Sequence, residues 1–158
     1  MMTENLQKAL NEQITAELWS ANLYLSMSFF LQREGLEGFA QWIKNRATER
    51  TECANQIASF MIKRHAIPKV DKVDVVPQNW GNAREAFEDA YKHECHLSKL
   101  IDLLVKIASD EKDHATQDFL WGFVRKQVEK EACTLKVVNK LKRSGEAGLL
   151  FLNDKLND

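Results

Sequence analysis

Residues that interrupt regular structure are scarce in this sequence. Its 158 residues include only 2 prolines and 6 glycines, whereas 44% of the residues are hydrophobic. A β-sandwich needs many turns, so the composition argues against an all-β fold and favours a helical one. No apolar run reaches the ~18 to 20 residues that span a bilayer, and no secretory signal opens the chain. We therefore expect an all-α, cytoplasmic protein with no membrane partner.

The sequence also contains few cysteines and has almost no net charge. The 3 cysteines, Cys53, Cys95 and Cys133, form no CxxC pair, so reduced thiols are the simplest interpretation. With 22 basic and 23 acidic side chains the net charge is −1, which excludes a globally basic nucleic-acid binder. The N-terminal arm Met-Met-Thr-Glu also lacks basic residues, so we expect no nucleic-acid partner.

Apolar residues recur at steps of three and four along most of the chain, which is the spacing of amphipathic helices. The pattern predicts a single domain over residues 1–158, with helices over about 4–33, 37–65, 82–110, 113–144 and 146–156. The connection 66–81 is long enough to run the length of a ~42 Å helix. The second and third helices can therefore be parallel. The sequence predicts a four-helix bundle with one long crossover and a short fifth helix.

Two segments outside the four long helices are also apolar. In the crossover 66–81, valines alternate with aspartates and lysines, which indicates an extended strand with one apolar face. The tail, 146–158, is too rich in leucine and phenylalanine to lie free in water. We expect both segments to pack against other subunits.

Polar residues interrupt the inward-facing row of each long helix near its middle. A charge on a buried row costs free energy unless it is paired or binds a ligand. One Glu from each of two helices, with an i, i+3 pair from each of the others, is the layout of di-iron carboxylate bundles. The six interruptions are Glu17, Arg50, Cys53, Glu94, Gln127 and Lys130.

The chain resembles the bacterial non-haem ferritins over nearly its whole length. The resemblance is carried by Leu10–Ile14 with Glu17, Asn22–Ser28, the region of Glu49, Tyr91–Glu94, Lys112–Thr116, Phe119–Leu120 and Gln127. It implies a ferritin-like fold and a cytoplasmic homo-oligomeric cage of 24 subunits that stores iron. In that family each subunit carries a ferroxidase centre, in which two irons are bound and Fe(II) is oxidised.

The resemblance also implies where the ligands of that centre would lie. They correspond to Glu17, Glu94, Gln127 and positions 50, 53 and 130. In the family, positions 50, 53 and 130 are Glu, His and Glu. This chain has Arg50, Cys53 and Lys130 instead. We interpret Arg50 and Lys130 as counter-ions to Glu17 and Glu94, which replace the metals with an internal salt-bridge cluster.

Further residues are candidates for weaker roles. Lys126 occupies a position where a third-site carboxylate is often seen in the family, and Glu49 and Glu129 beside it are candidate remnant metal ligands. Asp118 matches a position that lines an iron channel in some ferritins. Cys53 is either a small buried apolar residue or a thiolate ligand for a soft metal ion.

Three more side chains lie close to the interrupted rows. We expect the Tyr24 hydroxyl to reach Glu94 or a water molecule. His93 and His96 fall off the inward-facing row of their helix, so we expect them to face solvent or a subunit contact.

Three functions are compatible with this pattern. The first is an iron-storage cage subunit whose own di-iron ferroxidase centre is lost or weakened. The second is an active ferroxidase that uses a rearranged metal site. The third is a structural partner subunit in a mixed cage with an active ferritin.

Overall fold

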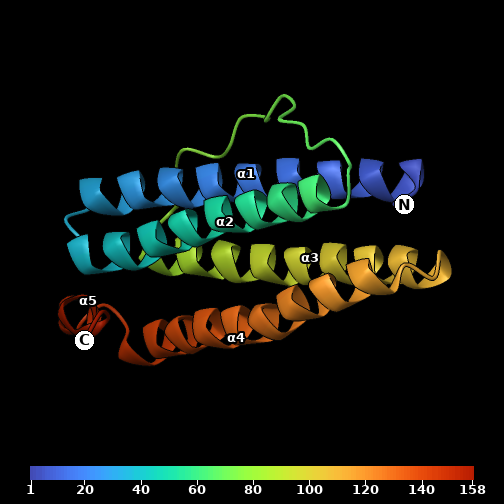
Figure 1. Cartoon of the computed structure of the whole chain (residues 1–158). Helices are drawn as coiled ribbons and strands as arrows, with labels where there is room; N and C mark the ends of the chain where they lie inside the picture. Colours follow the sequence, from blue (N-terminus) through green and yellow to red (C-terminus); the bar gives the residue numbers. More distant parts are fainter.

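The computed structural model describes all 158 residues and contains helices but no strands. Four long helices run side by side, and a short fifth helix closes one end of the bundle (Figure 1). This confirms the predicted all-α fold, a four-helix bundle with a short C-terminal helix. None of the five helices is long and apolar enough to cross a membrane. The helices are α1 (Glu4–Arg33), α2 (Glu37–Lys63), α3 (Ala83–Asp110), α4 (His114–Ser144) and α5 (Leu149–Lys155).

Side chains at three helix starts satisfy backbone N–H groups that have no partner within the helix. Thr3 accepts a hydrogen bond from the N–H of Leu6 at the start of α1. Asn82 and Asp113 do the same at the starts of α3 and α4. These caps are local in sequence, so each helix begins where its own residues specify.

The connection between α2 and α3 runs back along the outside of α1, so α2 and α3 are parallel (Figure 1). Four side chains of α1 donate hydrogen bonds to its backbone carbonyls, namely those of Asn11, Trp19, Ser26 and Arg33. Asn11 donates to the carbonyl of Ile67, and the indole N–H of Trp19 donates to the carbonyl of Val75. The crossover is therefore attached to the bundle by its backbone.

The expectation of a strand in the crossover is wrong. Residues 66–80 have no regular secondary structure, because their backbone lies against α1 side chains instead of another strand. Val73 and Val76 are half-buried, whereas Val70 and Val75 are 80% and 92% exposed. The valines therefore do not share one buried face, since two of them lie toward the bundle and two lie toward solvent.

The tail was expected to pack against other subunits, but α5 folds back onto its own chain. It lies against the ends of α2 and α4, where the backbone N–H of Phe39 donates to Asn153. A side chain on Gly38 would collide with the Asn153 carbonyl, so only glycine allows this approach. Leu150 and Phe151 on the outer face of α5 remain 67% and 69% exposed.

The buried core is divided into two apolar clusters along the bundle axis. One cluster, of 17 residues from Leu23 to Leu141, lies toward the α5 end. The other, of 13 residues from Met2 to Phe123, lies toward the N-terminus of α1. A layer of buried polar side chains separates the two clusters, and the candidate site lies in this layer.

Candidate functional site

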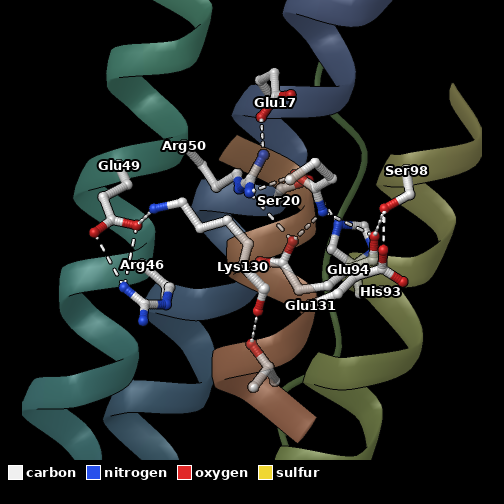
Figure 2. Close-up of polar contacts among 12 residues, drawn as sticks. Glu17, Ser20, Arg46, Glu49, Arg50, His93, Glu94, Ser98, Lys130 and Glu131 are labelled. Carbon is white, nitrogen blue, oxygen red and sulfur yellow. Dashed lines mark hydrogen bonds and ion pairs between the residues drawn. The ribbon is translucent and has the colours of Figure 1, made fainter. Parts of the chain in front are cut away.

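Each of the four long helices contributes one side chain to the buried polar layer. Figure 2 shows Arg50 of α2 between Glu17 of α1 and Glu94 of α3. Gln127 of α4 completes the group, and none of the four residues is more than 4% exposed. They lie on the inward-facing rows of their helices, so the packing that buries the apolar clusters also buries these polar groups.

Arg50 is the centre of the layer. Its Nη1 donates to Oε2 of Glu17 at 3.2 Å, and its Nη2 donates to Oε2 of Glu94 at 3.2 Å. The same Nη2 also donates to Oε1 of Gln127 at 3.0 Å. A planar guanidinium with several fixed donors suits this role, because it can bind groups from three helices at once. Arg50 therefore connects the other three helices to α2.

Every carboxylate oxygen in the layer accepts a hydrogen bond. The Oε1 atoms of Glu17 and Glu94 accept from Gln13 at 3.1 Å and from the Tyr24 hydroxyl at 3.0 Å. Gln127 Nε2 donates to Oε2 of Glu94 at 2.8 Å. The expected Tyr24–Glu94 bond is thus confirmed. Gln13 was missed in the sequence, although it lies one turn before Glu17 on the same helix face.

The buried layer holds one more negative than positive charge, because one guanidinium faces two carboxylates. Burial raises the pKa of Glu17 above its usual value, although Arg50 and Gln13 oppose the shift. Burial alone would lower the pKa of Arg50, but Glu17 and Glu94 outweigh it and raise that pKa. Arg50 therefore keeps its charge, and Glu17 is the member of the group that takes up a proton more readily than usual.

Lys130 does not have the role expected from the sequence. Its ammonium group pairs with Glu49 of α2 instead of Glu17 or Glu94 (Figure 2). Glu49 also accepts from Arg46 at 3.0 Å. Burial and the nearby Arg46 guanidinium lower the pKa of Lys130 to about 8. A long flexible stem lets the ammonium leave the core and reach a half-buried partner at the surface between α2 and α4.

Cys53 is half-buried and packs against the apolar cluster near the N-terminus of α1. Burial, followed by the charge of Glu17, raises the pKa of its thiol to about 11. Metal ions bind the thiolate, so this environment favours the small apolar interpretation of Cys53 over the soft-metal one.

The other candidate positions lie on the surface. Lys126, Glu129 and Asp118 are exposed on α4, and the ion pairs of the buried layer involve none of them. Glu49 is occupied by its two ion pairs. No group of three or more His, Cys, Asp or Glu side chains is arranged to hold a metal ion.

His93 was expected to face solvent or a subunit contact, but it faces the bundle. Its Nε2 lies 2.6 Å from the Ser20 hydroxyl, and its ring packs against Trp19 and Tyr24. Burial, with smaller contributions from His96 and Arg50, lowers the pKa of His93 to about 4. The imidazole is therefore neutral in the folded protein at neutral pH. His96 is exposed.

We expect His93 to make the folded protein less stable at mildly acidic pH. A neutral, half-buried imidazole contributes stability above its ordinary pKa of 6.5, and this contribution is lost as the pH falls toward 4. At about pH 5 the loss is about 2 kcal/mol. Thermal unfolding of the wild type and of His93→Gln at about pH 7.5 and pH 5 checks this.

When the pH is lowered between these two values, the melting temperature of the wild type should fall by several degrees more than that of His93→Gln. Glu17 titrates in the opposite direction, since its raised pKa favours the folded state on acidification, but its contribution is common to both proteins. An identical pH dependence of the two proteins would contradict the assigned environment of His93.

Comparison with known proteins gives a consistent result. The model of the ferritin-like domain family matches residues 7–144. A bacterial non-heme ferritin of Bacteroides fragilis (strain 638R) is 56% identical over 156 residues, which cover 99% of this chain and 98% of the relative. A bacterial non-heme ferritin of Campylobacter jejuni is 33% identical over 98% of this chain and 93% of the relative.

Solved structures agree with the sequence comparison. An open pore ferritin from the archaeon Archaeoglobus fulgidus superposes with a TM-score of 0.97. It is 40% identical, and the match covers 99% of this chain and 98% of the solved chain. An engineered closed form of the A. fulgidus ferritin superposes with a TM-score of 0.96 at 40% identity, over 99% of this chain and 96% of that one.

Proposed function

This chain belongs to the ferritin-like family, and we propose that it is a cytoplasmic iron-storage cage subunit whose own ferroxidase centre is lost or weakened. The storage role is supported by the family match and by relatives named bacterial non-heme ferritins. The weakened centre is supported by the chemistry of the buried layer.

The position of the Arg50 guanidinium is the main support for a lost or weakened ferroxidase centre. Glu17 and Glu94 would be the two carboxylates of a di-iron site, but Arg50 lies between them and donates to both at 3.2 Å. A ligand that bridges two irons must be an acceptor, whereas a guanidinium has only donors. The residues present therefore do not fit a di-iron centre.

Electrostatics leads to the same conclusion. A divalent ion about 4 Å from the guanidinium would be repelled by about 8 kcal/mol at an effective dielectric constant near 20. The layer contains only the carboxylates of Glu17 and Glu94, and both are already hydrogen-bonded to Arg50. Metal binding would have to break these bonds and move a buried cation, so we expect the site to bind Fe(II) weakly.

Assembly into a cage is supported by apolar side chains that this chain leaves in solvent. Leu25 and Phe29 on α1 are 37% and 55% exposed, and Val75 of the crossover lies close by in the same cavity. Leu150 and Phe151 form a second exposed apolar group on α5. We propose that copies of this chain cover these surfaces in a homo-oligomer of 24 subunits.

Stopped-flow measurement of Fe(II) oxidation by the metal-free assembled protein tests the proposed function. We expect only slow oxidation, without a rapid phase that saturates at about two irons per subunit. Glu94→Ala should leave the slow rate unchanged, because Glu94 holds no iron. A rapid saturable phase that Glu94→Ala abolishes would instead show an active ferroxidase with a rearranged site.

A subunit without a ferroxidase centre needs ferric iron from elsewhere, which favours a second role as partner in a mixed cage. Co-expression with an active ferritin tests this role. Mixed cages should contain both chains and should oxidise Fe(II) in proportion to the active chain. If the two chains assemble only separately, the mixed-cage role is excluded.

A further inference from the structure

A cavity of about 210 Å³ opens to the surface between α2 and α4, next to the buried layer. Arg50 and Gln127 form part of its wall. Lys126 and Lys130 of α4 also line it, together with Glu49 and Glu52 of α2. The cavity thus joins the buried guanidinium to two lysines that are accessible from outside.

The side chains that line this cavity include three cations, Arg50, Lys126 and Lys130, and two carboxylates, Glu49 and Glu52. Arg50 is paired with Glu17 and Glu94 behind the wall, and Lys130 is paired with Glu49, so Lys126 is the cation that remains free to bind a ligand. The thiol of Cys53 in the same wall stays protonated at neutral pH, because burial raises its pKa to about 11.

The arginines beside the cavity have hydrogen-bonding capacity that the protein does not use. The Nε atom of Arg50 is buried and finds no acceptor among protein groups. The same is true of Nε of Arg46, one helical turn away. A buried N–H without an acceptor destabilises the folded state, so a small acceptor in this region would stabilise the protein. Cations with free donors are the groups that bind oxyanions.

We propose that this cavity binds a small tetrahedral oxyanion of the class of inorganic phosphate. Lys126 supplies the accessible cation, Lys130 supplies a second ammonium that Glu49 shares, and Arg50 supplies the Nε donor that no protein group uses. The volume admits such an anion with part of its water shell. The binding concerns the metal-free protein, so it goes beyond the proposed function and does not require any iron chemistry.

Equilibrium dialysis of metal-free assembled protein against inorganic phosphate near neutral pH tests the proposal. We expect saturable uptake of about one phosphate per subunit, weakened by about tenfold or more in Lys126→Glu. Lys140→Glu is the matched control, since Lys140 is an exposed lysine on the same helix and the change in net charge is identical. This control should bind within about twofold of the wild type.

Two results would overturn the proposal. The first is the absence of saturable uptake by the wild type. The second is an equal effect of Lys126→Glu and Lys140→Glu, which would show that phosphate responds only to the overall charge of the cage. Neither result depends on oxidation kinetics, so a failure here is distinct from a failure of the proposed function.

Discussion

Replacing Arg50 by methionine is expected to lower the free energy of unfolding by about 3–5 kcal/mol. Methionine keeps most of the volume of the stem but removes the guanidinium, so Glu17 and Glu94 are left buried without a counter-ion. Thermal unfolding of the assembled protein measures the effect as a fall of about 10 °C. The loss should shrink at acidic pH, because burial raises the pKa of Glu17 and this carboxylate then takes up a proton more readily than usual.

Two control proteins separate the buried charge from a general effect of the substitution. Arg84→Met removes an arginine whose ion pair with Glu88 is largely exposed, so it should change stability by less than about 1 kcal/mol. The triple change Glu17→Gln, Arg50→Met and Glu94→Gln removes all the buried charges together. It should recover most of the stability lost in Arg50→Met. If Arg50→Met is as mild as Arg84→Met, the layer is not held by this ion-pair network.

Restoring the ferritin residues is expected to restore metal binding. The combined change Arg50→Glu, Cys53→His and Lys130→Glu removes both cations and places two additional carboxylates beside Glu17 and Glu94. Without metal, four buried carboxylates repel one another, so the variant should be less stable than the wild type. Two divalent ions balance this charge, and binding to the folded state then raises its stability.

Calorimetric titration with Co(II) or Zn(II) and thermal unfolding with and without the metal check this prediction. The triple variant should bind about two ions per subunit and gain several degrees on metal addition, whereas the wild type should do neither. Cys53→His alone is the control. It should not bind metal, because Arg50 stays in place. Failure of the triple variant to bind would mean that the surrounding scaffold has also lost the geometry of a di-iron site.

The fold follows largely from local features of the sequence. The spacing of apolar residues and the polar caps at Thr3, Asn82 and Asp113 are local, and they place the long helices. The length of the crossover implies parallel second and third helices, as observed (Figure 1). The path of α5 depends on contact between Asn153 and Phe39, which are distant in sequence, so the sequence pattern could not predict it.

The sequence predicted which side chains meet in the buried layer wherever packing fixes their position. Glu17, Arg50, Glu94 and Gln127 interrupt inward-facing rows, and the fold brings them together. Lys130 also interrupts such a row, yet its long stem carries the ammonium to Glu49, which no helical periodicity reveals. His93 falls off the row of α3, but it is half-buried because Ser20 and Trp19 of α1 lie against it.

A crystal soaked in Fe(II) or Zn(II) and measured by anomalous scattering tests directly whether Arg50 takes the place of the metals. We expect the Arg50 guanidinium to remain between Glu17 and Glu94, with no pair of metal ions among the four long helices. Two close anomalous peaks at that place, with Arg50 turned away from both carboxylates, would contradict this expectation.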